Sequence, residues 1–234
     1  MPRTAYDNGL GRVATGLEKS RRALGDPVEA QPKGGLTVFL DGAHIRCRPE
    51  CQQRHLDLVV GTIKSRNMCR RFGLVANATA SPGSSMREEL LAFGWKPGRM
   101  LTLISDGALA VPNLIRNAMG GDGQVKHILD WWHISMRIQH VEAAVQGLVQ
   151  IPGFTGIQVL FQHPTESLRW WLWHGRARVA ETYLKELMLD CARLADEPLA
   201  VRTAAARVQV RCETLYTHLA NNMEILCRLW PTVP

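Results

Sequence analysis

The stretch Leu36-Thr37-Val38-Phe39-Leu40-Asp41-Gly42 decides the fold class of this chain. The residues before Asp41 form a dense apolar and β-branched run, as expected of a strand buried on both faces of a sheet. We therefore expect a strand over 36–41 that ends at Asp41. Gly42 follows it and leaves room for a backbone or a phosphate to approach.

Outward from this strand, the sequence predicts a βββαβαβα order of elements. The further expected strands cover 56–63, 72–79, 100–107 and 125–130. The expected helices between and after them cover 84–94, 111–119 and 134–149. The short polar connections between the first three strands are typical of an antiparallel meander, whereas strands joined through a helix run parallel. Ser85 and Glu88 stand in the capping-box relation at the start of the first helix.

Three antiparallel strands followed by two parallel ones make a mixed five-stranded α/β sheet of the RNase H-like kind. In that order the fourth strand lies beside the first, so Asp41 and Asp106 would emerge on neighbouring strands about 4.8 Å apart. A pair of Mg²⁺ or Mn²⁺ ions would turn the repulsion of these carboxylates into ligation and support in-line phosphoryl transfer. The plainer alternative is that each Asp-Gly pair is a turn.

Composition excludes several classes of protein. The chain has 234 residues, 46% of them hydrophobic, with a formal net charge of +7 and six cysteines. These values are typical of a globular protein and argue against disorder, collagen and coiled coil. Since no apolar run reaches the roughly 18 residues of a membrane span and residues 1–7 lack a signal-peptide core, we expect a cytoplasmic protein with reduced thiols.

Four segments of this sequence resemble the DDE transposases of the ISKra-type bacterial insertion sequences. The segments are Leu40-Asp41-Gly42-Ala43-His44, Ile104-Ser105-Asp106-Gly107-Ala108, Ile128-Leu129-Asp130-Trp131-Trp132-His133-Ile134-Ser135-Met136-Arg137 and Trp171-Leu172-Trp173-His174-Gly175. The resemblance runs from about Val28 to Glu224, and its most specific part is the Asp-x-x-His signature of Asp130 and His133.

This resemblance implies an RNase H-like core interrupted by a helical insertion, and cut-and-join chemistry on DNA. Asp41 and Asp106 would be the first two acids of the triad and the metal ligands, while Asp130 and His133 would support the site or the DNA. The implied partners are transposon ends and target DNA, together with a second copy or a full-length transposase. The expected domains are a linker over 1–35, with a short helix at 13–24, the core over 36–150, the helical insertion over 151–229 and an aberrant tail over 230–234.

The third acid departs from the family pattern. In such transposases it lies on a helix after the insertion, and this sequence changes to an apolar, proline-containing run from Ile225. We therefore expect a truncated transposase, inactive alone, without a terminal DNA-binding domain and with an uncovered sheet surface. One alternative is a non-catalytic DNA-binding or regulatory derivative. The other is a compact RNase H-like nuclease that uses Glu142, which lies twelve residues after Asp130, as its third acid.

Other residue groups have both a functional and a plain interpretation. His44, Cys47, Cys51 and His55 have a tolerable zinc-ligand spacing, but accident is the favoured explanation. Seven basic against two acidic residues between 46 and 71 predict either phosphate contact or protection of a sheet edge. The arginines proposed for DNA are Arg46, Arg48, Arg54, Arg70 and Arg71.

Farther along the chain, tryptophans and scattered cations also have two interpretations. Trp170, Trp171 and Trp173 either stack on a base or, as we favour, pack between helices. The expected helices there cover 165–175, 176–195 and 198–226. The scattered Lys185, Arg193, Arg202, Arg207 and Arg211 indicate a solvated surface.

Overall fold

A computed structural model describes residues 33–48, 54–75, 81–121, 123–152 and 165–229. The strands are β1 Leu36–Arg46, β2 His55–Lys64, β3 Cys69–Val75, β4 Leu101–Ser105 and β5 Val125–Leu129. The helices are α2 Pro82–Ala92, α3 Ala110–Met119, α4 Trp131–Val149, α6 Glu166–Trp173, α7 Ala177–Ala192, α8 Leu199–Asn221 and α9 Met223–Leu229. The predicted helix at 13–24 and the predicted tail at 230–234 lie outside the described residues.

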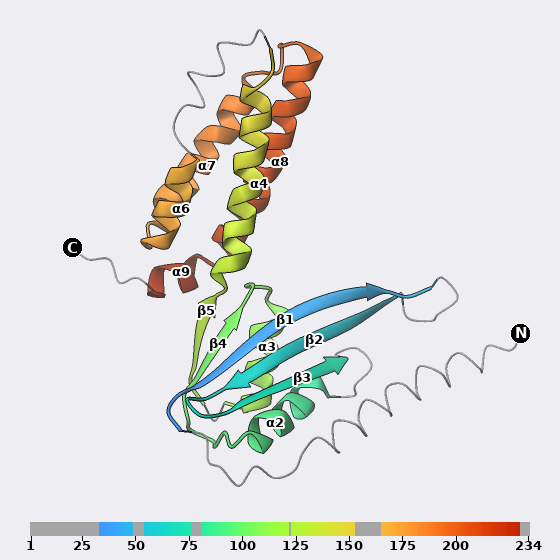
Figure 1. Cartoon of the computed structure of the whole chain (residues 1–234), viewed down its shortest axis with the longest axis vertical. Coiled ribbons are helices and arrows are strands. Elements are labelled where there is room, and N and C mark those ends of the chain that lie inside the picture. Colours follow the sequence, from blue (N-terminus) through green and yellow to red (C-terminus); the bar gives the residue numbers. More distant parts are fainter. Residues whose placement is uncertain (1–32, 49–53, 76–80, 122, 153–164, 230–234) are drawn as a thin grey trace, which may run out of the picture. The chain divides into compact units, whose positions relative to one another are not determined.

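The five strands form one sheet in the order β3-β2-β1-β4-β5 (Figure 1). The β1–β2 and β2–β3 pairs are antiparallel, while β1 and β4 run parallel. This confirms the mixed sheet that the sequence predicts.

The strand β1 is longer than predicted. It continues past Asp41 to Arg46, because β2 supplies an antiparallel partner at every position up to Arg46↔His55. The parallel ladder with β4 is shorter and runs from Leu36↔Leu101 to Phe39↔Ile104. Asp41 therefore lies within β1 rather than at its end, two residues beyond the last position paired with β4.

Two helix boundaries also differ from the prediction. The first helix begins at Pro82, and its N-cap is Ser81, whose side chain accepts the backbone N–H of Ser84 at 3.4 Å. The predicted capping box of Ser85 and Glu88 is therefore wrong, because both residues already lie inside the helix. The last predicted helix is divided into α8 and α9 at the buried Asn222, whose carbonyl accepts the N–H groups of Ile225 and Leu226 at 3.0 Å.

One face of the sheet packs on α2 and α3. Alternate residues of β1 (Leu36, Val38 and Leu40) point to this face and are buried, together with Leu101 and Leu103 of β4. Apolar residues of α2, of the turn after α2 and of α3 also belong to this core: Met86, Leu90, Phe93, Trp95, Val111, Leu114, Ile115, Ala118 and Met119.

The opposite face carries exposed apolar side chains. Phe39 is 38% exposed, Val60 is 49% exposed and Ile45 is 48% exposed. Val60 is the cross-strand partner of Asp41, and residues 39, 41 and 45 share a face by strand alternation. The amine of Lys64 lies over the Phe39 ring, 5.1 Å from its centroid.

A second core joins α4, α6, α7, α8 and α9. Contacts divide the chain into one unit of residues 1–104 and 108–126 and another of residues 105–107 and 127–234. The apolar side of α4, represented by Ile134, Ile138 and Val141, belongs to the helical core with Leu184 and Leu215. This helix therefore packs with α8 and α6, although the predicted core extends to residue 150. Among the described residues, no helix is long and apolar enough to cross a membrane.

Candidate functional site

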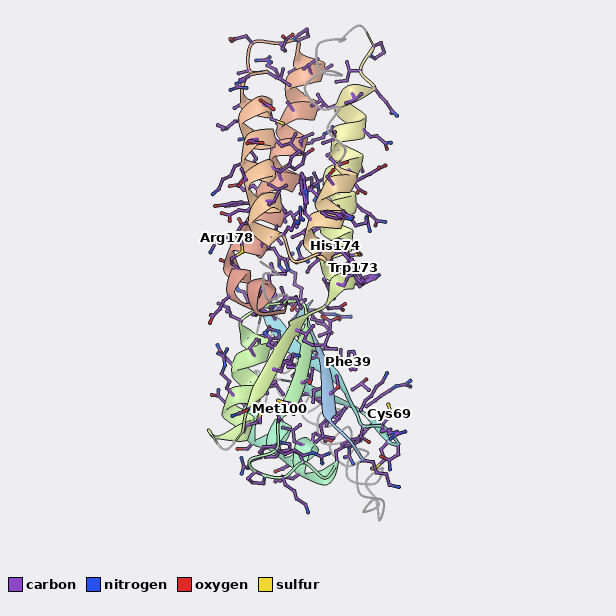
Figure 2. All side chains as sticks on the ribbon, turned by 90° about the vertical axis from the view of Figure 1, so that its left-hand side faces the viewer. Phe39, Cys69, Met100, Trp173, His174 and Arg178 are labelled. Atoms are coloured by element: carbon purple, nitrogen blue, oxygen red, sulfur yellow. The ribbon has the colours of Figure 1, made fainter. Side chains whose placement is uncertain are left out.

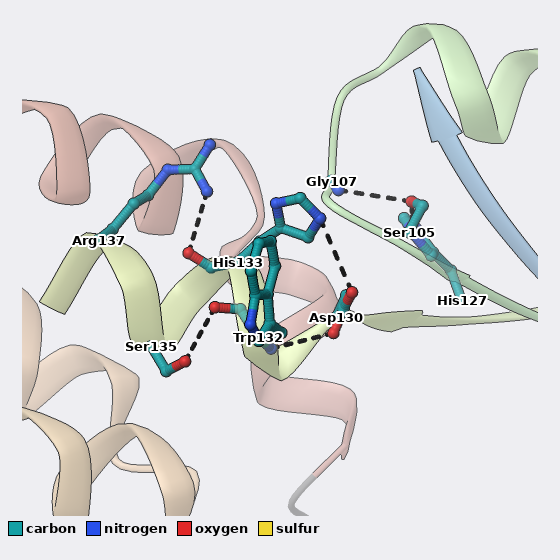
Figure 3. Close-up of polar contacts among 8 residues, drawn as sticks. All are labelled: Ser105, Gly107, His127, Asp130, Trp132, His133, Ser135 and Arg137. Atoms are coloured by element: carbon teal, nitrogen blue, oxygen red, sulfur yellow. Dashed lines mark hydrogen bonds and ion pairs between the residues drawn. The ribbon is translucent and has the colours of Figure 1, made fainter. Parts of the chain in front are cut away.

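The exit of β4 is fixed by a buried serine. The Ser105 hydroxyl accepts the Gly107 N–H at 3.4 Å (Figure 3). It also lies 2.8 Å from Nε2 of His127, and the Ser105 carbonyl accepts the Asp130 N–H at 2.8 Å. These bonds hold the segment that carries Asp106 against the start of α4. Asp106 itself is half-buried.

The Asp-x-x-His signature forms the start of α4. Asp130 is the N-cap, and its Oδ1 accepts the Trp132 N–H at 3.0 Å. Its Oδ2 lies 3.7 Å from Nε2 of His133, one turn into the helix (Figure 3). Both carboxylate oxygens are thus occupied by the helix that Asp130 begins, as expected of a capping aspartate. The structure brings Asp130 and His133 together and assigns them a structural contact.

Residues from α8 complete the surroundings of Asp106. The His133 carbonyl accepts a hydrogen bond from Arg137 at 3.2 Å. Burial lowers the pKa of His218 to about 4; nearby Arg137 acts in the same direction, while Asp106 opposes it. Nε2 of His218 is buried and has no hydrogen-bond partner among the described residues. A group of Asp106, His133, Arg137 and His218 therefore lies within electrostatic range.

The turn after Asp106 packs against Asn222, the residue at the end of α8. Gly107 has φ +88°, and a Cβ at this position would lie 2.7 Å from the side chain of Asn222. Asn222 in turn donates to the His218 carbonyl at 2.9 Å. Sequence reasoning missed His218 and Asn222, because they lie more than a hundred residues from Asp106 and belong to no local motif.

Asp41 lies on β1, in the unit that holds the sheet, and is exposed. Gly42 beside it has open space where a side chain would be. Within the described residues, no three or more His, Cys, Asp or Glu side chains are grouped so that they could hold a metal ion. Asp41 and Asp106 stay the metal ligands that the sequence predicts. Carboxylate oxygens completed by water and phosphate are the donor set that suits Mg²⁺ or Mn²⁺ rather than zinc.

Glu142, the predicted third acid of the compact-nuclease alternative, lies on α4 and pairs with Arg169. It lies three turns along α4 from Asp130, about 18 Å at the rise of an α-helix. Its carboxylate accepts a hydrogen bond from Arg169 of α6 at 3.4 Å and is half-buried in that pair. The compact-nuclease alternative, which depends on Glu142 beside the other acids, stays a prediction.

Three residues of the predicted zinc-like group, His44, Cys47 and His55, make other contacts in the structure. Nδ1 of His44 lies 2.5 Å from the carboxylate of Asp57 across the β1–β2 pair. The Cys47 N–H donates to the Arg54 carbonyl at 2.9 Å and closes the hairpin. His55 is the cross-strand partner of Arg46. Cys51 lies outside the described residues.

The five arginines proposed for DNA fall into two groups. Arg46, Arg48, Arg54 and Arg71 are exposed. Arg70 instead points to the helix-covered face of the sheet, where its Nε donates to the carboxylate of Glu89 at 2.9 Å. Glu89 is 2% exposed, so this pair is part of the core. Arg70 has a structural role that the sequence did not predict.

The tryptophans around α6 are mostly paired with other rings. Trp131 meets Trp173 edge to face with ring centroids 5.0 Å apart, and Trp171 meets Tyr183 at 5.4 Å. Trp170 stacks on His174 at 4.3 Å, with Arg176 over its ring. Trp173 and His174 lie at the end of α6 (Figure 2). Packing between helices, the favoured prediction, thus accounts for Trp171, while Trp170 and Trp173 stay about half exposed.

Comparison of the chain with protein-family models, with curated proteins and with solved structures finds no match.

Proposed function

We propose that this chain is a DDE-type transposase component of a bacterial insertion sequence, with an RNase H-like sheet. In this proposal Asp41 and Asp106 hold Mg²⁺ or Mn²⁺ for cleavage and joining of DNA strands. The parallel register of β1 and β4 carries the argument. Phe39 pairs with Ile104, and each aspartate is the second residue after its member of that pair. The strand order β3-β2-β1-β4-β5 supports the RNase H-like part of this proposal.

The residues have distinct parts in this chemistry. When bound, the metal would supply a Lewis acid that activates a water or a 3′-hydroxyl and stabilises charge on the phosphate. Asp41 and Asp106 contribute the carboxylate ligands. Asp130 and His133 are positioning residues, because their contacts fix the start of α4 beside the segment that carries Asp106. The exposed Arg46, Arg48, Arg54 and Arg71 are the proposed contacts to DNA phosphates, and the proposed location is the cytoplasm.

Manganese binding tests the acid pair directly. We would titrate Mn²⁺ into the full chain and follow binding by electron paramagnetic resonance. The Asp41→Asn and Asp106→Asn variants should each weaken Mn²⁺ binding, and the double variant should abolish it. Asp190→Asn is the matched control, because its carboxylate pairs with Arg193 on the helical unit. Unchanged Mn²⁺ affinity in the double variant would overturn the proposal.

A second candidate is a non-catalytic, DNA-binding derivative that regulates a full-length transposase or forms mixed oligomers with it. Within the described residues, no group of three or more His, Cys, Asp or Glu side chains could hold a metal ion, which favours it. Nicking of supercoiled plasmid DNA in Mg²⁺ separates the two candidates. A catalytic component gives nicking that is lost in Asp106→Asn, whereas the derivative binds the plasmid without nicking it.

A further inference from the structure

A groove of about 310 Å³ lies between α4 and α8 in the helical unit. Its lining residues come from one stripe of each helix: His140, Ala143, Ala144 and Gly147 of α4, and Ala204, Arg207 and Arg211 of α8. Both helices belong to one core, so the groove is built on packed elements.

Small side chains make the floor of this groove. Ala143, Ala144 and Gly147 follow His140 at three, four and seven residues, which places all four on one face of α4. A Cβ added at Gly147 would meet no atom within 4 Å. The floor therefore offers space and apolar contact but no side-chain hydrogen-bonding group, so a ligand would be recognised by the polar groups beside it.

Those polar groups are basic. Arg207 and Arg211 are one helical turn apart, about 6 Å along the axis of α8, and both are exposed. Within the described part of the chain, neither guanidinium has a hydrogen bond or an ion pair. None of the described lining residues is acidic, and Glu142 of α4 is held by Arg169.

This arrangement differs from the solvated surface that the sequence indicates for the basic residues of this region. Arg207 and Arg211 look scattered along the sequence, but a four-residue spacing on a helix brings them to the same groove with His140. Two unpaired like charges one turn apart repel each other. A ligand with repeated negative charges would remove that repulsion.

We propose that the α4–α8 groove binds the phosphodiester backbone of nucleic acid. Each guanidinium can donate two parallel hydrogen bonds to two oxygens of one phosphate. Because the two arginines are offset along α8, together they suit successive anionic groups rather than one. The small floor lets the backbone approach α4 closely. The groove contains neither of the proposed metal ligands and does not need metal chemistry, so this site goes beyond the proposed function.

Fluorescence anisotropy with a short labelled DNA duplex of random sequence tests the proposal. The Arg207→Gln/Arg211→Gln variant should bind about tenfold more weakly than the unaltered chain. It should also lower the slope of log affinity against log salt by about 1.8, since each phosphate contact on a duplex contributes about 0.9. The matched control is Arg178→Gln/Arg202→Gln, which removes the same charge from exposed positions outside the groove and should change neither value as much.

A second variant keeps the charge and fills the space. Gly147→Leu should weaken DNA binding with an unchanged far-UV circular dichroism spectrum, because the added side chain would occupy the groove rather than the core. Equal loss of affinity in the control and groove variants, or full binding by Gly147→Leu, would overturn the proposal.

Inorganic phosphate distinguishes a backbone site from a site for a small anion. At matched ionic strength, inorganic phosphate should not displace the duplex, and displacement would overturn the assignment to a backbone. All titrations are run in EDTA, so that the proposed metal site does not contribute and a failure of the acid-pair proposal leaves the groove result interpretable.

Discussion

At the scale of single residues, Arg70 shows how one contact changes the role expected of a cation. Removing its side chain leaves the buried carboxylate of Glu89 without this partner. We expect Arg70→Met to lower the free energy of unfolding by about 3 kcal/mol, in the range for a broken buried ion pair. Urea unfolding followed by circular dichroism measures this change.

Arg71 is the neighbouring control for this prediction. Its side chain lies on the opposite face of β3 and is exposed. Arg71→Met should leave the free energy of unfolding within about 0.5 kcal/mol of the original. If the two variants lose equal stability, the core role of Arg70 is wrong.

Gly107 gives a second prediction at this scale. Its φ of +88° and its approach to Asn222 both oppose a side chain, so Gly107→Ala should cost about 2 kcal/mol of stability. Gly42→Ala is the matched control, since nothing lies within 4 Å of an added Cβ there. Thermal unfolding compares the two variants. A smaller loss for Gly107→Ala than for Gly42→Ala would contradict the packing described around Asn222.

Local motifs at this scale were predictable and distant partners were not. The Asp130 and His133 signature is visible in sequence because a cap and its first turn are contiguous. The burial of Arg70 was not visible, because strand alternation assigns it to a face only once the register of β3 against β2 is known. His218 and Asn222 reach the surroundings of Asp106 through the packing of α8.

At the scale of elements, α8 carries a group whose titration affects folding. Burial lowers the pKa of His218 from 6.5 to about 4. Between these two values the unfolded chain binds a proton that the folded chain does not, so stability rises with pH there and falls as the pH drops from 6.5 towards 4. Urea midpoints measured across this window should decrease on acidification.

His218→Gln supplies the control for that dependence. A neutral side chain at this position removes the titration, so the acid-induced fall in the urea midpoint should become shallower in this variant. An identical fall in both proteins would assign the pH dependence to other groups.

The elements themselves were largely predictable, and their boundaries were set by partners. The order of strands and helices follows from apolar periodicity and from the length of the connections. The extension of β1 to Arg46 depends on a partner strand that pairs beyond the apolar run. The break between α8 and α9 depends on the burial of Asn222, which periodicity does not encode.

At the scale of the whole molecule, the chain has two separate apolar cores. Leu215 is fully buried in the helical core and Leu103 in the sheet core. Each Leu→Ala variant should destabilise its own core by about 3 kcal/mol. Hydrogen exchange read by mass spectrometry should then show faster exchange in α7 and α8 for Leu215→Ala, and in β1 and β4 for Leu103→Ala. Equal acceleration of both sets of amides in either variant would show one cooperative unit.

The sequence predicted both the sheet region and the helical region but placed α4 with the sheet. The predicted boundary after residue 150 follows the order of elements along the chain. In the structure, the apolar side of α4 packs on α8 and so joins the helical core. The sequence could not assign this side to a core before the partner helix was known.

The continuity of α4 has a consequence for spacing. This helix runs without interruption for 19 residues from the Asp130 cap, about 28 Å, and its C-terminal half forms the floor of the proposed backbone groove. Ala143 and Ala144 lie about 20 Å along the helix from Asp130. If a duplex lay parallel to α4 in that groove, the point where the groove binds it would be about six base pairs along the DNA from the position of Asp130. The helix would act as a molecular ruler that fixes how far along the DNA a bound contact lies from the Asp-x-x-His signature.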